Sequence, residues 1–384
     1  MRFPEFSGEW KHVHLKEIAE FQKQRISTAL LNNNNYISTE NILQDFEGIQ
    51  CSSSMPANVN VIKYQNEDIL LSNIRPYLKK VWFADRKGGC SADVLVLRGN
   101  KCDKYFLYYV IASDRFINYV MSGIKGVKMP RGDKNQMEEY AFSIPTNMEQ
   151  KRIAKFISIL DERIRLQNKI IEKYESLIQA MCDTLIESEQ LKVELSFNDF
   201  GKPYSGLSGK SAEDFGNGWP YITYMNVYQN QIIDITDVGL VKINETEQQS
   251  VVRYGDILFT LSSETPDEVG MGAVYLGDAY PLYLNSFCFG VHITDESKIF
   301  SPFLAYYIST KSFRKAVFPL AQGSTRFNLQ KNDFMKKIFH FPTVKKQSEI
   351  YSVLKAYSDK LSIEKNIVNL LCEQKSYLLR QLFI

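Results

Sequence analysis

Few residues in this chain have the types and spacing that catalysis requires. The run Gly209-Lys210-Ser211 is similar to the end of a phosphate-binding loop, but Tyr204 stands where the first glycine of that loop belongs. Gly270 and Gly272 begin a Gly-x-Gly pattern, but Tyr275 occupies the position of its third glycine. An amino-methyltransferase motif of the Asn-Pro-Pro-Tyr type does not occur. We therefore predict that the chain binds no nucleotide or methyl donor and needs no cofactor.

The sequence gives equally little support for a nuclease site or a metal site. Three Glu-x-Lys triplets begin at Glu9, Glu149 and Glu373, a number expected by chance in a sequence of this charge content. His12 and His14 alternate along an expected strand near the N-terminus, where such a pair is more often exposed than bound to metal. We predict no metal site and no catalytic activity for this chain.

Basic residues accompany glycine at two matching places, Lys125-Gly126-x-Lys128 and Gly323-x-x-Arg326. Lysine and arginine donate hydrogen bonds to phosphate oxygens and guanine edges, and glycine permits a close backbone approach. We predict that these loops bind double-stranded DNA, the alternative for any one residue being a solvated turn. The predicted DNA-binding residues are Arg75, Lys79, Lys80, Lys125, Lys128, Arg131, Tyr224, Asn226, Gln322, Ser324, Thr325, Arg326 and Asn328.

The overall composition is that of a folded protein without a strong net charge. Among 384 residues, 46 lysines and arginines and 44 aspartates and glutamates give a net charge of +2, which excludes a histone-like basic field. No uncharged apolar run is long enough to span a membrane, and the N-terminus lacks the apolar core of a signal peptide. The six cysteines form no Cys-x-x-Cys pair. We predict a cytoplasmic protein with reduced cysteines and no membrane partner.

The elements that must position these residues occur twice. Residues 106–186 align without a gap on residues 303–383, at a constant offset of 197. Upstream, Asp68-Ile69-Leu70 returns as Asp256-Ile257-Leu258, an offset of 188, and Val13 returns as Val193, an offset of 180. We expect the largest insertion of the second copy, nine residues, to form an exposed loop near 262–270.

Each copy begins with a segment of mixed character. Residues 68–72, 93–97 and 231–235 have the composition of strands, and residues 303–316 have helical spacing. The fold class we predict is therefore α+β, with two repeated mixed α/β domains.

Each copy ends in a heptad pattern. Alternate steps of four and three residues from Ile153 and from Ile350 reach mostly apolar positions over about 35 residues. Thr146 and Glu149 form a predicted capping box at the start of the first helix. We predict two antiparallel coiled-coil helices, the alternative being two separate amphipathic helices that each pack on their own domain. The selected seam residues are Ile157, Leu160, Ile164, Gln167, Ile171, Leu354, Leu361, Glu364 and Val368.

The seam contains one polar position that both copies share. Gln167 and Glu364 are equivalent under the offset of 197. A lone polar residue in a coiled-coil core tends to fix the register of the helices. We state that role for these two residues as a hypothesis.

These patterns predict four segments: domains at 1–148 and 188–344, each followed by a helix, at 149–187 and 345–384. Thirty-five helical residues span roughly 50 Å, which is longer than the roughly 34 Å of one DNA turn. Two similar domains on antiparallel helices would be related by an approximate twofold axis. Such an arrangement suits two half-sites on duplex DNA.

This layout resembles the specificity subunit of Type I restriction and modification systems over nearly the full length of the chain. Residues 144–150, followed by Ile153-Ala154, look like the Pro-rich, Glu-Gln start of the central conserved helix of that family. The second copy has short motifs in the order of the family's target recognition domains. These are Trp219-Pro220-Tyr221-Ile222 leading to Asn226, Gly255-Asp256-Ile257-Leu258, and Gln322-Gly323-Ser324-Thr325 leading to Asn328-Leu329.

The resemblance implies a chain that reads an asymmetric, two-part DNA sequence. It also implies partners, namely two modification (methyltransferase) subunits, with restriction (motor and nuclease) subunits joining them, and no catalysis by this chain. Two other classes of protein stay open from the residues alone. One is a diverged stand-alone nuclease or methyltransferase, and the other is a coiled-coil scaffold whose domains bind protein.

Overall fold

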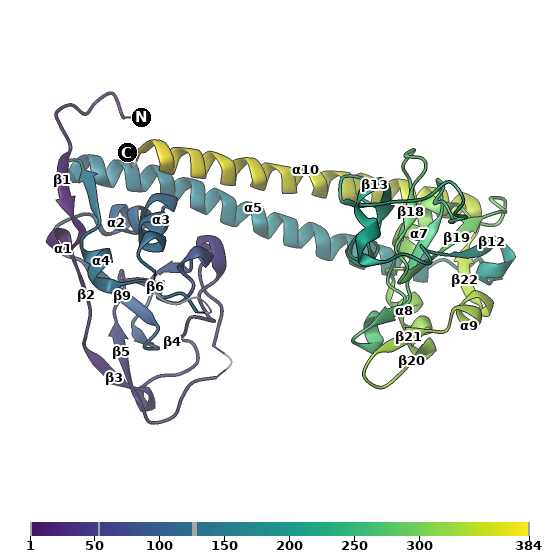
Figure 1. Cartoon of the computed structure of the whole chain (residues 1–384), viewed down its shortest axis with the longest axis horizontal. Helices are drawn as coiled ribbons and strands as arrows, with labels where there is room; N and C mark the ends of the chain where they lie inside the picture. The colour runs from purple at the N-terminus through teal and green to yellow at the C-terminus, as the bar shows by residue number, and fades with distance from the viewer. Residues whose placement is uncertain (1, 53, 125–128, 383–384) are drawn as a thin grey trace. The chain divides into compact units, whose positions relative to one another are not determined.

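The computed structural model describes residues 2–52, 54–124 and 129–382, and its internal contacts divide the chain into two units. Unit 1 comprises residues 1–168 and 366–384, and unit 2 comprises residues 169–365. Two long helices, α5 (Asn147–Glu187) and α10 (Val344–Leu382), each contribute one half to each unit (Figure 1). Within the described residues, none of the helices is long and apolar enough to cross a membrane.

Among the residues that the structure describes, unit 1 contains ten short strands and several short helices ahead of α5. Its elements are β1 (Lys11–His14), α1 (Leu15–Ile18), β2 (Ala19–Phe21), β3 (Arg25–Ser27), η1 (Thr28–Leu30), β4 (Tyr36–Ile37), η2 (Gln44–Phe46), β5 (Asn60–Tyr64), β6 (Ile69–Ser72), η3 (Pro76–Leu78), β7 (Val81–Phe83), β8 (Gly88–Cys90), β9 (Val94–Gly99), α2 (Lys104–Ile111), α3 (Asp114–Ser122), α4 (Lys134–Glu138) and β10 (Ala141–Ile144).

Unit 2 has a similar order of elements, with differences around its second sheet. Its elements are β11 (Lys192–Leu195), η4 (Phe197–Asp199), β12 (Gly201–Ser205), η5 (Ala212–Asp214), β13 (Phe215–Ile222), α6 (Tyr224–Gln229), β14 (Val238–Val241), β15 (Ile257–Thr260), β16 (Ser262–Ser263), η6 (Pro266–Glu268), β17 (Gly272–Val274), β18 (Tyr283–Leu284), β19 (Cys288–Ile293), α7 (Ser301–Tyr307), α8 (Lys311–Val317), η7 (Phe318–Leu320), β20 (Ala321–Gln322), β21 (Phe327–Leu329), α9 (Lys331–Lys336) and β22 (Phe339–Pro342).

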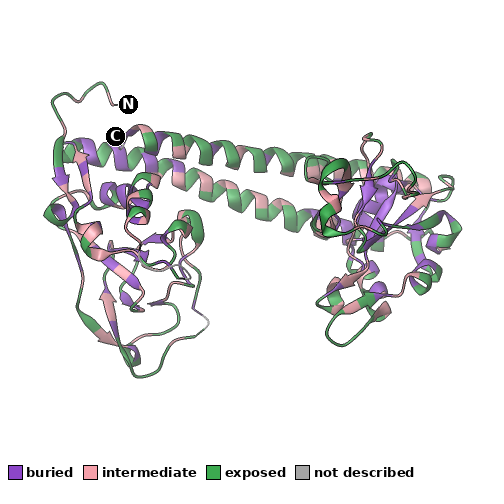
Figure 2. Ribbon diagram, viewed as in Figure 1, coloured by how far each residue is buried: buried purple, intermediate pink, exposed green. Residues whose placement is uncertain are grey.

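The two units share the topology of their main sheet, which confirms the predicted α+β duplication. A four-stranded antiparallel sheet has the order β2-β9-β6-β7 in unit 1 and β12-β19-β15-β17 in unit 2. A second sheet contains one parallel pair, β4 with β8 in unit 1 and β13 with β18 in unit 2. Every residue of β6 and of β15 is buried, as expected for mostly apolar strands that are covered on both faces. Figure 2 colours the buried residues of the chain purple.

Strand pairing corrects the expected alignment near the start of each unit. Val13 pairs with Phe142, and Leu195 pairs with Phe339, which is the equivalent of Phe142 at the offset of 197. Val13 therefore corresponds to Leu195, an offset of 182, and not to Val193. The helices that follow, α1 and η4, agree with this correction because both begin with the same capping box.

The nine-residue insertion expected in one loop is also wrong. Ile69 and Ile257 are equivalent residues. Phe83 lies opposite Ile69 and Val274 lies opposite Ile257, so Phe83 corresponds to Val274, an offset of 191. Gly89, in β8, corresponds to Tyr283, an offset of 194. The additional residues are therefore shared among the loops on either side of β7 and the loop after β9. Loops accept insertions because the register of the paired strands is then unchanged.

Three local expectations differ from the structure. Residues 303–316 form two helices, α7 and α8, because the hydroxyl of Thr310 accepts a hydrogen bond from the backbone of Phe313 and caps a new helix. Residues 231–235 contribute a single β-bridge and no strand. The expected capping box of α5 is incomplete, because the carboxylate of Glu149 is buried against Arg2.

The heptad prediction is confirmed by burial. Every predicted seam position of α5 and α10 is buried or half-buried. In unit 1, Ile157 and Leu160 share one apolar core with Leu371 and Leu378. Since each unit pairs one half of α5 with the opposite half of α10, the two helices pack antiparallel. The alternative of two unpaired amphipathic helices is therefore wrong.

Equivalent side chains attach each domain to its helices. In unit 1, Gln150 of α5 accepts a hydrogen bond from the backbone N–H of Asp103 and donates one to the carbonyl of Pro145, both at 2.8 Å. In unit 2, Gln347 makes the same two bonds, to Phe300 and Pro342, at the same distances. Both glutamines are buried, so their hydrogen bonds hold the first turn of α5 and of α10 against the domain that precedes each helix.

Candidate nucleic-acid interface

Two loops that the sequence selects separately are side by side in unit 1. The backbone N–H of Arg75 donates to the carbonyl of Pro130 (2.8 Å), and that of Gly132 donates to Asn73 (3.1 Å). Ile74 and Arg131 form an isolated β-bridge between the same two segments. Arg75 and Arg131, 56 positions apart in the chain, are therefore on neighbouring segments and are both exposed.

Unit 2 builds the equivalent frame with short strands. β16 pairs with β21, so that Ser262 lies opposite Asn328, and β21 pairs in turn with β20. At offsets of 188 and 197, Ser262 and Asn328 are the equivalents of Ile74 and Arg131. The structure thus brings the predicted loops of each unit to one corresponding place.

The turn between β20 and β21 exposes most of the predicted residues of unit 2. Gly323, at its start, has a φ of 144°, and a Cβ atom there would lie 2.0 Å from the carbonyl oxygen of Arg326. Only glycine allows this close approach, which explains the glycine in the motif. The exposed residues of this hairpin are Gln322, Ser324, Thr325, Arg326 and Asn328.

Two predicted residues of unit 2 have structural contacts instead. Asn226 is fully buried, and its amide donates to the carbonyls of Asp234 (2.7 Å) and Asp237 (2.6 Å). Its side chain holds the loop after α6 and is not presented to solvent, so we withdraw it as a DNA contact. The Tyr224 hydroxyl donates to the carbonyl of Ser262 (2.7 Å) and supports β16.

Two predicted lysines of unit 1 are also engaged within the domain. The ammonium group of Lys79 is 2.8 Å from Asp114 and 3.9 Å from Asp45. That of Lys80 donates to the carbonyl of Thr39 (2.8 Å). Charge neutralisation and internal hydrogen bonds leave these two lysines less suited to phosphate than Arg75. Lys125 and Lys128 lie outside the residues that the structure describes.

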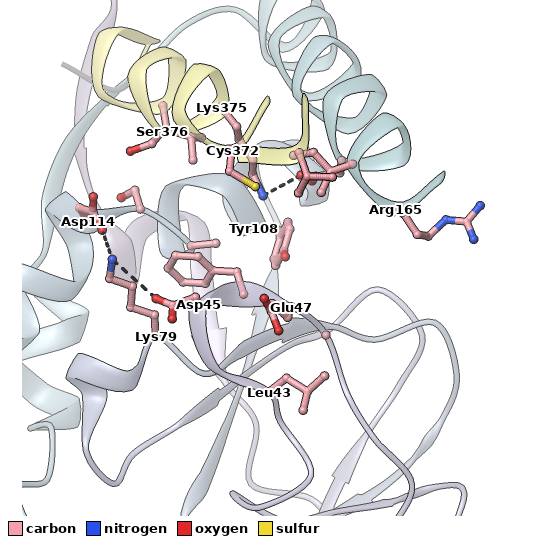
Figure 3. Close-up of a pocket in the computed structure, with 18 of the residues that line it drawn as sticks. Leu43, Asp45, Glu47, Lys79, Tyr108, Asp114, Arg165, Cys372, Lys375 and Ser376 are labelled. Carbon is pink, nitrogen blue, oxygen red and sulfur yellow. Dashed lines mark ion pairs between the residues drawn. The ribbon is translucent and has the colours of Figure 1, made fainter. Parts of the chain in front are cut away.

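Lys79 is part of the wall of a cavity of about 1110 Å³ in unit 1 (Figure 3). The cavity lies between the loop at 43–48, the junction of α2 and α3, and the adjoining parts of α5 and α10. Its charged groups include two ion pairs, of Lys79 with Asp114 and of Lys375 with Asp161. We assign this cavity no ligand.

One structural residue beside the unit 2 hairpin escaped sequence reasoning. The guanidinium of Arg314 donates to the carbonyls of Asp267, Val269 and Gly270 at 2.7–2.8 Å, and burial lowers its pKa. It thereby holds the loop after β16. Its equivalent in unit 1 is the buried Ile117. An arginine aligned with an apolar residue of the repeat was the one sign in the sequence that Arg314 has a special role.

A buried carboxylate supports the central sheet of each unit. Asp68 accepts two hydrogen bonds from Arg98 (2.7 Å each), and the equivalent Asp256 lies 2.9 Å from the ring of His292. Both aspartates also accept a backbone N–H from three residues earlier. The Asp-Ile-Leu motif is therefore a structural feature of the sheet and not a contact surface.

In the coil, the two shared polar positions belong to different units. Gln167 is half-buried in unit 1. Glu364 is buried in unit 2, with its carboxylate 2.7 Å from the ammonium group of Lys360 one turn earlier. Their proposed role in register stays a hypothesis.

Comparison with known proteins places this arrangement in a family. The model for the Type I restriction modification DNA specificity domain matches residues 7–176 and 205–372. The chain belongs to this family, whose members read DNA sequence in Type I restriction and modification systems.

Individual relatives agree with this assignment. The chain is 24% identical to the Type I restriction enzyme MjaVIII specificity subunit of Methanocaldococcus jannaschii, covering 95% of this chain and 89% of the relative. In fold, it is similar to a chain solved in a study of complex assembly and conformational transition of the type I R-M system, with a TM-score of 0.60, 18% identity, and 98% of each chain covered. It is also similar to the Type I restriction-modification S subunit from M. genitalium, with a TM-score of 0.56, 16% identity, and 100% and 99% covered.

Proposed function

We propose that this chain is the DNA-reading, non-catalytic subunit of a Type I complex, and that each unit reads one half of a two-part site on double-stranded DNA. The observation that carries the proposal is the repeated backbone frame of the two interfaces. Ile74 with Arg131, and Ser262 with Asn328, are equivalent pairs that present different exposed side chains. Because the side chains differ, the two half-sites differ, and the recognised sequence is asymmetric.

The exposed donors of both interfaces suit nucleic acid. Arginine and amide side chains form the hydrogen bonds that read base edges in the major groove, and arginine also binds phosphate. Of the predicted residues, Arg75, Arg131, Gln322, Arg326 and Asn328 retain this role in the proposal.

The helices provide a surface for protein partners. Apolar side chains outside the buried seam are exposed on both helices in both units. In unit 1 they include Phe156, Ile159, Leu166, Leu370 and Tyr377. In unit 2 they are Ile170, Leu177, Val353 and Ile363.

Exposed apolar stripes of this kind are suited to protein association. We propose that one modification subunit binds at each unit, and that restriction subunits join the complex thus formed.

The test is to express the chain with its modification subunits in a host without other adenine methylation and to map methylated adenines across the genome. The proposal expects methylation within one asymmetric, two-part sequence, and none when the chain is omitted. A modified sequence that is unchanged without this chain would contradict it. Calorimetry on the isolated chain tests the diverged-enzyme alternative, which would be supported by binding of a methyl donor.

A further inference from the structure

One pair of equivalent positions differs in chemistry between the two interfaces. In unit 1, Asn73 donates its backbone N–H to the carbonyl of Asp93 (2.8 Å) and accepts one from Gly132 (3.1 Å). In unit 2, Leu261 does the same with Phe287 and Leu329, both at 2.8 Å. Both units therefore have the same frame of three hydrogen-bonded backbone segments. In this frame, Phe287 occupies the position of Asp93.

The side chains on this frame form an ion pair in unit 1. A carboxylate oxygen of Asp93 is 3.0 Å from the guanidinium of Arg131, and both side chains remain solvent-accessible. The pair shows that side chains at these two positions reach one another. The carboxylate holds the arginine in place while leaving other donors of its guanidinium available.

In unit 2, the same two positions hold Phe287 and Asn328. Phe287 is 58% exposed, and Asn328, on β21, is also exposed. The backbone N–H of Phe287 donates to the side-chain oxygen of Asn285 (2.9 Å), so the turn that carries the ring is held by hydrogen bonds. An apolar ring and an amide thus replace the ion pair at one site of the frame.

We propose that this pair of positions decides which base pair each unit reads. In unit 2, the amide of Asn328 would bind adenine at N6 and N7, and Phe287 would contact the methyl group of thymine, so both select an A·T pair. In unit 1, Arg131 would bind guanine at O6 and N7 and so select a G·C pair. The inference rests on the proposed function, because it requires that these frames face the major groove.

Exchange of the pairs is the main test. The chain carrying Phe287→Asp and Asn328→Arg, assembled with its modification subunits, is assayed for methylation of duplexes that vary at each base of the two half-sites. The expected result is that one position in the unit 2 half-site changes its requirement from A·T to G·C, while the unit 1 half-site is unchanged. Asn328→Ala alone is expected to lower discrimination at that position roughly 5- to 150-fold.

A second measurement tests the role of Phe287 without relying on the double variant, which could fail to fold. Replacing the thymine by deoxyuridine removes the methyl group, and should weaken binding of the natural complex about fourfold. The same replacement should leave the binding of a Phe287→Ala complex unchanged. Leu240→Ala, which truncates an exposed apolar side chain on β14 of the same unit, is the matched control and should respond to deoxyuridine like the natural chain.

The outcomes separate this inference from the proposed function. If the natural complex selects a two-part site, but neither the exchange nor deoxyuridine has an effect at any position, the assignment of Phe287 and Asn328 is wrong. An effect of Phe287→Ala that is equal at all sequences and independent of the methyl group also overturns it, because the ring would then act as a wedge. If the natural complex selects no site, the proposed function itself fails.

Discussion

The ammonium group of Lys375 on α10 lies 2.6 Å from the carboxylate of Asp161 on α5. The hydroxyl of Tyr109 donates to the other oxygen of that carboxylate (2.7 Å), so the three groups connect the domain of unit 1 to both helices. Burial and the neighbouring carboxylate raise the pKa of Tyr109, which keeps its hydroxyl protonated as a donor. The equivalents of Asp161 and Lys375 in unit 2 are Ser358 and the buried Ile178. The two units therefore join domain to coil by different means.

Removal of this carboxylate should destabilise unit 1. Asp161→Ala leaves a partly buried ammonium group and hydroxyl without their acceptor, and should lower the free energy of unfolding by about 1–3 kcal/mol. Urea denaturation followed by circular dichroism measures the change. The matched control is Glu175→Gln, which breaks an exposed ion pair with Lys365 on the same helices and should cost less than about 1 kcal/mol.

A double variant tests whether the effect arises from the unpaired lysine. Asp161→Ser with Lys375→Ile copies the residues of unit 2, in which the tyrosine donates to a serine hydroxyl (3.0 Å) and the two positions hold no charged groups. This variant should recover most of the stability that Asp161→Ala loses. A double variant as unstable as the single one would show that the cost arises elsewhere.

Charge on the seam and charge on the outer stripe should have different effects. Ile157 is 0% exposed, and Ile159, two residues along the same helix, is 54% exposed. Ile157→Asp should lower stability by several kcal/mol, because it buries an unpaired carboxylate. Ile159→Asp should leave the melting temperature nearly unchanged, but reduce binding of a modification subunit. Thermal denaturation and native mass spectrometry of the mixed subunits measure the two effects, and equal behaviour of the variants would contradict the assignment of the faces.

Exposed arginines of the interfaces should contribute more to DNA affinity than a lysine that is already paired with a carboxylate of the domain. Arg75→Ala and Arg326→Ala should each weaken binding, and a lost phosphate contact lowers the slope of log K against log salt by about 0.9. Lys79→Ala is the control, since the ammonium group of Lys79 already pairs with Asp114. Fluorescence anisotropy at several salt concentrations measures the slopes. A larger effect for Lys79 than for Arg75 would show that DNA binds on the cavity side of the loop.

Asn226 should matter for stability and not for base discrimination. Asn226→Ala leaves the carbonyls of Asp234 and Asp237 without a donor and should destabilise unit 2 by about 1–3 kcal/mol. Hydrogen exchange should increase in residues 230–237, and the bases that the complex prefers should stay the same. A changed base preference in a fully folded variant would return Asn226 to the DNA interface.

Much of the fold could be predicted because the repeat and the heptads are local patterns. The offset of 197 is reproduced in single hydrogen bonds, as those of Gln150 and Gln347 show. Upstream, insertions blurred the alignment, and only strand pairing showed that Val13 corresponds to Leu195. Sequence similarity over a few residues cannot fix such a register, whereas backbone pairing can.

The site was harder to predict because its contacts join distant segments. Nothing near Lys79 in the sequence indicates its pairing with Asp114 or Asp45, and nothing near Asn226 indicates that its amide is buried. Phe287 belongs to no motif, and its place on the frame of Asn328 follows only from backbone hydrogen bonds that join Leu261 to Phe287 and to Leu329. Composition and spacing identify loops that carry donors, but burial and ion pairing decide which donors are available.

The domain of unit 2, which lies between the two long helices in the sequence, allows the separate reading of the half-sites to be tested directly. Residues 190–343 lie between the end of α5 at Glu187 and the start of α10 at Val344, and the pairing of β11 with β22 brings both ends of this segment together. Replacing this segment by the corresponding segment of a relative should therefore leave α5, α10 and the domain of unit 1 intact. Methylation mapping should then show a new sequence in one half of the site and the original sequence in the other. The control is the chain with its own segment returned across the same junctions, which should restore both halves. Two altered half-sites from this single replacement would show that the domains do not read DNA separately.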